Sequence, residues 1–249
     1  MYYPEGTIKA LPAIVEIHGG GWMYGNKELN KKYAMDLARR GFTVVNINYH
    51  LVQEKRYPVQ IKDVFAAFNW IEKNYKNYHI DIDRVFITGD SAGAHLAAVS
   101  TAILYNESVK ERLNISSELD IKAAGLICGV YDLNIYKSIK KFIVGKYANV
   151  LLGERAKQSV NKDLFAFKDV YAGNIPPLYL MSSRQDFIRE QTLAFVKYIE
   201  ANNIRHKLRY YDKGNENKLM HVFNVMYPHY KESVEVNDEM CDFFLSACR

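Results

Sequence analysis

Short apolar runs rich in β-branched residues alternate along the chain with longer segments in which apolar residues recur every three or four positions. The short runs have the composition of buried strands, and the longer segments have the period of amphipathic helices. Strands are expected at residues 13–17, 43–48, 84–89, 123–130, 177–183 and 206–211. Helices are expected at residues 28–40, from 58 through at least 71, 94–104, 187–203 and about 231–247. This alternation predicts an α/β fold with a mostly parallel sheet flanked by crossover helices.

One long segment interrupts the alternation. Residues 133–170 are too many for a plain connection, and they carry numerous apolar side chains. We interpret this segment as a small helical cap over the functional site, inserted into a single domain that spans residues 1–249. An ordinary crossover helix with a long lead-in is the alternative interpretation.

Composition narrows the possible function classes. The chain has 249 residues, of which 49% are hydrophobic, and this suits one large α/β domain. The formal net charge of +5 comes from scattered basic pairs, whereas nucleic-acid binding favours a concentrated basic stripe. No apolar run approaches the ~20 residues of a membrane span, and the first residues lack the apolar core of a signal peptide. We therefore expect neither a nucleic-acid partner nor a membrane partner.

Cysteine usage points to a reducing compartment. The three cysteines are Cys128, Cys241 and Cys248, and they do not suggest a disulfide framework. Cys241 and Cys248 lie seven positions apart on an expected helix, which places their Cα atoms about 10 Å apart, too far for a disulfide bond. A cytoplasmic protein is expected.

Residues 89–93 form the sequence Gly-Asp-Ser-Ala-Gly, a G-x-S-x-G motif between a predicted strand and a predicted helix. Such a tight turn strains the serine backbone and requires small residues two positions before and after it. The turn projects the hydroxyl of Ser91 above the sheet, and the start of the helix offers backbone N–H groups to a developing anion. Chance matches to the motif are common, but its place between strand and helix makes Ser91 the candidate nucleophile.

A second motif, His18-Gly19-Gly20-Gly21-Trp22, follows the first predicted strand. Its three glycines leave backbone N–H groups unshielded, so a substrate oxygen can approach them. The two motifs occur in the order that acyl transfer requires; a flexible turn is the alternative interpretation. Because no phosphate-loop, H-E-x-x-H or C-x-x-C motif occurs, we expect no metal and no other cofactor.

Together the two motifs resemble those of the hormone-sensitive-lipase-type esterases of the α/β-hydrolase superfamily. They are also similar to the related compact, feruloyl-esterase-like branch. The resemblance covers nearly the whole chain and includes Asn48-Tyr49-His50-Leu51, Tyr57-Pro58, Asp63 and Trp70. It implies an α/β-hydrolase fold and a serine carboxylesterase that needs no cofactor. It also implies that Gly20, Gly21 and Ala92 supply the N–H groups of an oxyanion hole.

An acid must follow the serine along the chain, and a histidine must follow the acid. Asp186 is the candidate acid, because it lies between a predicted strand and a predicted helix, where the family pattern places its carboxylate. The other aspartates fit less well: Asp163 and Asp169 lie in the expected cap, and Asp212 follows a later strand.

The candidate base is His221, which lies in the loop after the last predicted strand. The sequence from this residue resembles the H-x-F pattern of the family, although Met220 stands where the family often has glycine. His206 and His229 also follow the acid, at the start of a strand and near the last helix.

Aromatic residues near the motifs suggest where a substrate binds. Trp22, Tyr24 and Tyr131 are candidate substrate-binding residues that line an apolar acyl pocket; core packing is the alternative interpretation. The expected substrate is a small-molecule ester with a short-chain or aromatic acyl group. Three rivals stay open: an arylformamidase-like amidase, a carbohydrate esterase on the same triad, and a non-catalytic binding protein with a hydrolase fold.

The start of the chain departs from the family pattern. Only 17 residues precede His18, whereas the family carries more chain there, including its first strands. We expect these strands to be shortened or missing, with residues 2–4 as the tail of the second. An exposed sheet edge near residues 43–48 would then favour pairing with a second subunit, and a homodimer is expected.

Overall fold

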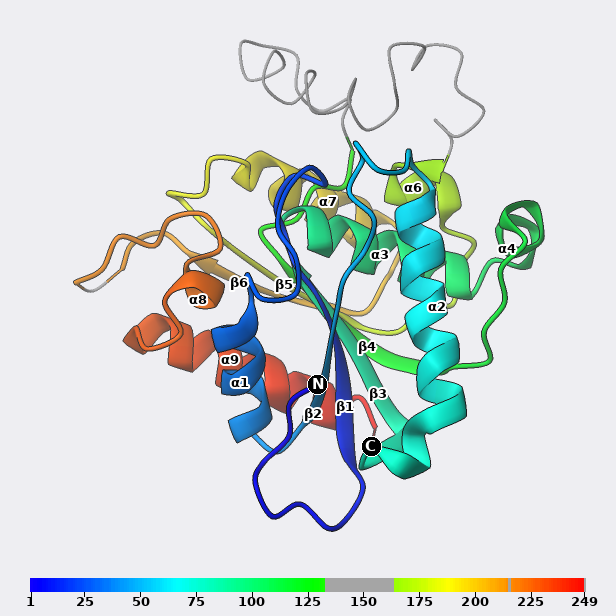
Figure 1. Ribbon diagram of the computed structural model, residues 1–249. Coiled ribbons are helices and arrows are strands. Elements are labelled where there is room, and N and C mark those ends of the chain that lie inside the picture. Colours follow the sequence, from blue (N-terminus) through cyan, green and yellow to red (C-terminus); the bar gives the residue numbers. More distant parts are fainter. Residues whose placement is uncertain (133–163, 215, 249) are drawn as a thin grey trace.

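The computed structural model describes residues 1–132, 164–214 and 216–248, which contain a six-stranded sheet (Figure 1). In chain order the strands are β1 (Leu11–Ile17), β2 (Thr43–Ile47), β3 (Ile80–Asp90), β4 (Ile121–Ile127), β5 (Leu178–Ser183) and β6 (His206–Tyr211). The order across the sheet is β2-β1-β3-β4-β5-β6, and all neighbours are parallel. The predicted α/β fold with a mostly parallel sheet is confirmed.

The helices lie between and after the strands, as the alternation predicts. They are α1 (Lys31–Arg39), α2 (Val59–Asn74), η1 (Tyr75–Asn77), α3 (Ala92–Leu104), α4 (Glu107–Leu113), α6 (Phe167–Val170), α7 (Arg189–Ala201), α8 (Phe223–Met226) and α9 (Lys231–Ser246). Apolar residues of α2, α3 and α7 share one buried cluster, and those of α1, α8 and α9 share another. The two sets therefore cover opposite faces of the sheet (Figure 1).

The central strands read as continuous apolar runs because both of their faces are buried. Along β1, Val15 belongs to the cluster with α2 and α3, whereas its neighbour Ile14 faces α1 and α9. In β3, Phe86 packs on the second face, where its ring stacks on Phe244 with centroids 4.9 Å apart. Parallel strands end at one common edge of the sheet, so the loops that follow β1, β3, β5 and β6 gather there.

The strand β2 forms one edge of the sheet, but this edge differs from the expectation. Residues Thr43–Ile47 are buried and only Asn48 is exposed, because helices cover both faces. The backbone of Tyr2 also pairs with Val44 in an antiparallel bridge, with N–O distances of 3.0 and 2.7 Å. The bridge agrees with the expected strand tail at residues 2–4, but the side chains of the predicted exposed edge are not exposed.

The predicted cap lies mostly outside the described residues, which leave out 133–163. At its end, Leu164 and Phe165 are buried, and α6 packs against the cluster that contains α3. The single domain with a cap insertion stays a prediction. Within the described ranges, no helix is both long enough and apolar enough to cross a membrane.

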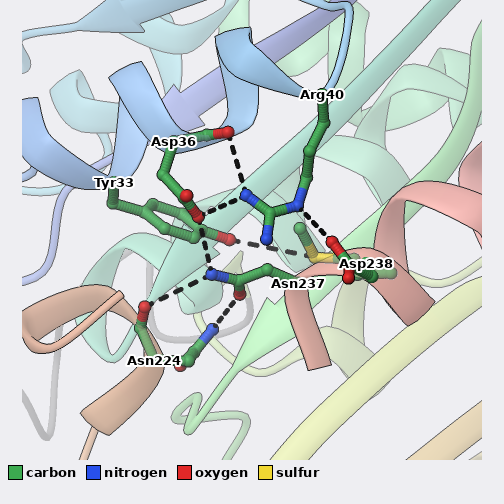
Figure 2. A network of polar contacts seen from close by, with 7 residues as sticks. Tyr33, Asp36, Arg40, Asn224, Asn237 and Asp238 are labelled. Carbon is green, nitrogen blue, oxygen red and sulfur yellow. Dashed lines mark hydrogen bonds and ion pairs between the residues drawn. The ribbon is translucent and has the colours of Figure 1, made fainter. Parts of the chain in front are cut away.

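A polar network joins α1, α8 and α9 on one face of the sheet (Figure 2). The amide of Asn237 donates to Asp36 at 3.1 Å and accepts a bond from Asn224 at 2.9 Å. Asp36 also pairs with Arg40 at 2.6 Å, and Arg40 reaches Asp238 at 2.7 Å. Because both asparagines are fully buried, these bonds hold the three helices in one arrangement.

Replacing Asn237 should destabilise the fold. In Asn237→Ala the buried Asn224 amide loses its acceptor, so we expect the free energy of unfolding to fall by about 2 kcal/mol. Urea unfolding followed by tryptophan fluorescence measures the loss. Asp242→Ala, an exposed position on the same helix, is the control and should change stability by less than about 0.5 kcal/mol. Equal losses in the two variants would contradict the role given to the network.

Candidate active site

Ser91 occupies a strained turn between β3 and α3. Its backbone is left-handed, with φ 52° and ψ −112°, and its N–H donates to the carbonyl of Ile127 at 2.8 Å. A Cβ added to Gly93 would overlap the carbonyl oxygen of Ile17, and one added to Gly89 would collide with the backbone of Gly93. The turn thus has the geometry and the small residues that the G-x-S-x-G motif predicts.

Asp186 and His221 meet at the same edge of the sheet. Asp186 follows β5 and is fully buried, and its Oδ1 lies 2.7 Å from Nδ1 of His221. The carboxylate also accepts bonds from Ser182 Oγ at 2.8 Å and from the N–H of Ile188 at 3.0 Å. A carboxylate at Nδ1 selects the tautomer that carries its proton there, which leaves Nε2 able to accept a proton.

The loop that carries His221 is attached to the end of β5. Ser183 Oγ donates to the carbonyl of Leu219, and Gln185 forms a parallel bridge with Met220. The side chain of Met220 is exposed and its backbone is not left-handed, so glycine's freedom is not required there. Instead, Val222 takes the left-handed conformation, with φ 52°. The departure from the family pattern at Met220 therefore fits the fold.

Cys128 lies against this acid–histidine pair, a contact that the sequence analysis missed. Its sulfur accepts the N–H of Val222 at 3.4 Å and lies within 4.8 Å of ligand atoms of Asp186 and His221. Burial raises the pKa of the Cys128 thiol, and the Asp186 carboxylate raises it further, so the thiol keeps its proton. Thiolate, imidazole and carboxylate can bind zinc, but a protonated thiol and an Nδ1 already bonded to Asp186 fit a metal poorly.

Ser91 and His221 line one cavity of about 480 Å³. The predicted oxyanion residues Gly20, Gly21 and Ala92 line the same cavity. Ala92 is the first residue of α3, where backbone N–H groups have no partner within the helix.

The glycine loop presents free donors to this cavity. Within the described part of the chain, the N–H groups of Gly20 and Gly21 donate to no acceptor. Gly20 has φ 102°, and its carbonyl accepts bonds from the N–H groups of Met23 and Tyr24 at 3.0 and 3.1 Å. A Cβ at Gly20 would overlap the carbonyl of Tyr24, so this turn requires glycine.

Glu16, Asn30 and Asp90 form a buried polar triplet that is bonded to the glycine loop, and the sequence analysis did not identify it. The amide nitrogen of Asn30 donates to Glu16 Oε1 and Asp90 Oδ1, both at 2.6 Å. Asp90 Oδ1 also accepts the N–H of Gly19 at 2.9 Å. Burial raises the pKa of Glu16 well above its usual range and also raises the pKa of Asp90. A glutamate inside an otherwise apolar strand is the sequence signal that marks this triplet.

The three predicted substrate-binding residues fall in different places. Trp22 and Tyr24 line the cavity, and Tyr24 is well exposed. Tyr131 does not belong to the cavity wall: it is buried and its ring stacks on Phe195 with centroids 4.0 Å apart. The core interpretation is therefore the one that the structure supports for Tyr131, because its ring is buried against Phe195.

His95 holds Trp22 at the cavity. Trp22 Nε1 donates to His95 Nδ1 at 3.3 Å, so the proton of the neutral ring lies on Nε2, which donates to the carbonyl of Phe165 at 2.8 Å. His18 is bonded to the glycine loop, since its Nδ1 lies 2.8 Å from the carbonyl of Gly19.

The comparisons with known proteins agree with this geometry. The BD-FAE family model matches residues 1–195, most of the chain.

The chain belongs to the BD-FAE family. Esterase B of Lactobacillus rhamnosis, solved with a tributyrin phosphonate, superposes on it with a TM-score of 0.90 and 30% identity, covering 99% of this chain and 79% of that one. Brefeldin A esterase, a bacterial homologue of human hormone-sensitive lipase, shares the fold, with a TM-score of 0.78 at 16% identity over 99% of this chain and 72% of that one. The predicted family and α/β-hydrolase fold are confirmed.

Among the curated relatives, arylacetamide deacetylase of Bos taurus is 35% identical over 127 residues, which are 47% of this BD-FAE chain and 31% of that protein. The chain spans about a third to a half of the length of the first three curated relatives that it matches.

The buried His95 should make stability depend on pH. Burial lowers the pKa of His95 to about 4, whereas an exposed histidine has a pKa of ~6.5. The unfolded chain binds the proton first, so this contribution to stability is fully present above pH 6.5 and is lost as the pH falls to about 4. Across that window the loss amounts to at most about 3 kcal/mol.

His95→Gln keeps a donor but removes the titration, so its free energy of unfolding should fall less steeply than that of wild type between pH 6.5 and 4. Denaturant unfolding at several pH values measures the slope. His229→Gln, an exposed position, is the control and should keep the wild-type slope. An unchanged slope in His95→Gln would show that protonation of His95 does not cause the loss of stability.

Proposed function

We propose that this BD-FAE family member is a serine carboxylesterase that hydrolyses small-molecule esters through Ser91, His221 and Asp186. One observation carries the proposal: the serine on its left-handed turn and the histidine paired with a buried carboxylate line the same cavity. Nucleophile, base and orienting acid are the three groups that acyl transfer to a serine requires.

Each group has a defined task in the proposed reaction. His221 Nε2 accepts the hydroxyl proton as Ser91 Oγ attacks the ester carbonyl, and Asp186 stabilises the resulting imidazolium. The N–H groups of Gly20, Gly21 and Ala92 stabilise the oxyanion, and each such donor typically contributes about 10²–10³ in rate. The C–O bond breaks, and the alcohol leaves with the proton from His221. Water, deprotonated by the same histidine, then hydrolyses the acyl-enzyme.

The cavity supports a small ester as substrate. Its volume of about 480 Å³ lies in the usual range for sites that bind small molecules, and most of its wall is apolar. Trp22 and Tyr24 supply aromatic surface beside the oxyanion loop. A short-chain or aromatic acyl group fits this space. The tributyrin phosphonate that names the esterase B structure also supports short acyl chains.

An amidase or deacetylase is the second candidate, and the name of the bovine relative, arylacetamide deacetylase, favours it. The same serine, histidine and aspartate serve either leaving group, because both reactions pass through an oxyanion. Rates on phenyl acetate and acetanilide, with an N-formyl aryl amine and an acetylated sugar beside them, separate the amidase, the arylformamidase and the carbohydrate esterase.

The cytoplasmic location expected from the sequence stays a prediction. All three cysteines are free, with Cys128 and Cys241 buried and Cys248 exposed. An exposed free thiol is compatible with a reducing compartment.

Ser91→Ala should abolish the esterase activity. Without its nucleophile the protein should hydrolyse p-nitrophenyl acetate at least about 10³-fold more slowly than wild type, and a fluorophosphonate probe should no longer label it. Ser108→Ala, an exposed serine of α4, is the control and should keep both rate and labelling. Equal rates in Ser91→Ala and wild type would refute the proposal. A wild-type protein that neither hydrolyses esters nor reacts with the probe would instead indicate a non-catalytic binding protein.

A homodimer is proposed from the outer edge of β2. Within the described residues this edge pairs with Tyr2 and with no further strand, and a second copy would add its backbone bonds at the exposed end of the strand, near Asn48. Light scattering at tens of micromolar should give twice the chain mass of 28.8 kDa. A single-chain mass at that concentration would rule the dimer out.

A further inference from the structure

The catalytic cavity extends to a wall formed by α1 and α8. Leu29, just before α1, and Val225 and Met226 of α8 contribute apolar surface to this wall. Lys32, in the first turn of α1, lines the cavity together with them.

This part of the wall is held in place by bonds outside the cavity. Helix α1 contacts α8 directly. Figure 2 shows Asp36 of α1 joined through Asn237 to Asn224 of α8. Asp36 lies one turn after Lys32, and Asn224 lies next to Val225. The network therefore fixes the helix that carries the cation relative to the helix that carries the apolar surface.

The charge of Lys32 is not balanced by a neighbour. Its exposed side chain has no carboxylate within ion-pairing distance among residues 1–132, 164–214 and 216–248. The nearby acids are engaged elsewhere: Glu28 pairs with Lys31 at 3.8 Å, and Asp36 pairs with Arg40 at 2.6 Å.

No other lysine or arginine of the described residues lines the cavity. Asp90, the one carboxyl group that the described part of the chain places in this wall, already accepts bonds from Gly19 and Asn30. An anion that enters the cavity therefore meets this one lysine next to the apolar surface of the wall.

We propose that the esterase selects esters that carry a carboxylate on their apolar part, with Lys32 as the residue that determines this specificity. The inference rests on the proposed esterase function. The apolar part of the substrate contacts Leu29, Val225 and Met226, and its carboxylate reaches the ammonium group of Lys32. The ester group lies at Ser91, inside the same cavity.

A purely structural role for Lys32 makes a different prediction. Lysine stems often pack on apolar surface while the charge stays in water. In that case Lys32→Gln, which keeps much of the stem, should bind charged and neutral esters in the wild-type proportion. Under our proposal the anionic-to-neutral proportion follows the charge at position 32, so Lys32→Gln should lower it and Lys32→Glu should lower it further.

The experiment compares kcat/KM for matched esters of different charge. For the alcohol side these are 4-acetoxybenzoate, its neutral methyl ester and the cationic 3-acetoxy-N,N,N-trimethylanilinium; for the acyl side they are monoethyl glutarate and neutral ethyl pentanoate. In at least one set, the anionic-to-neutral ratio should fall about fivefold in Lys32→Glu, and less in Lys32→Gln. The change should shrink in about 0.5 M salt, because screening weakens exposed charges.

Lys31→Glu is the matched control. It makes the same change of charge at the neighbouring position, on a side chain that does not line the cavity, and it should keep the wild-type ratio. Ratios that stay constant in Lys32→Glu for both sets, or that change equally in Lys31→Glu, overturn the inference while leaving the esterase in place. A wild-type protein inactive on every ester of both sets, charged and neutral alike, would overturn the proposed function itself.

Discussion

The hydrogen bond between Asp186 and His221 is the interaction on which the proposed chemistry depends. Asp186 has no contact with solvent, so its charge is stabilised by the donors around it, which include the Ser182 hydroxyl, the N–H of Ile188 and the histidine ring. Removing a partner from a buried charge costs several kcal/mol, which holds the loop of His221 in place. This pairing is possible because β5 and β6 are parallel neighbours and end at the same edge of the sheet.

Much of this fold was predictable because the central strands are buried on both faces and therefore read as apolar runs. The exact ends of the strands and the shortest helices were harder to predict. The strand β4 ends at Ile127 and not at residue 130, because Cys128 takes a left-handed backbone, with φ 47°. The four-residue helix α8 was not predicted, since so short a helix shows no complete apolar period, and α6 lies at the end of the segment expected to form a helical cap.

The residues of the candidate site divide in the same way. Ser91 and the glycine loop lie in local motifs, so their neighbours along the chain were enough to identify them. Cys128 and Lys32 reach the site only through the order of the strands and the packing of helices, which one sequence does not reveal. Tyr131 was expected to bind substrate, but an aromatic residue near the end of a strand suits a cavity wall or a core equally well. In the structure its ring stacks on Phe195 in the core.

One carboxylate oxygen connects the proposed reacting centre with the cavity wall that carries Lys32. Asp90 Oδ1 accepts both the N–H of Gly19, in the oxyanion loop, and the amide of Asn30, which immediately precedes α1. Asp90 also adjoins Ser91, so the proposed nucleophile, the proposed oxyanion donors and the helix that carries Lys32 share one anchor. A substrate held at α1 is therefore positioned relative to the serine as well as bound. Binding energy from a remote group raises kcat only when the group is fixed relative to the reacting atoms, and this anchor provides that connection.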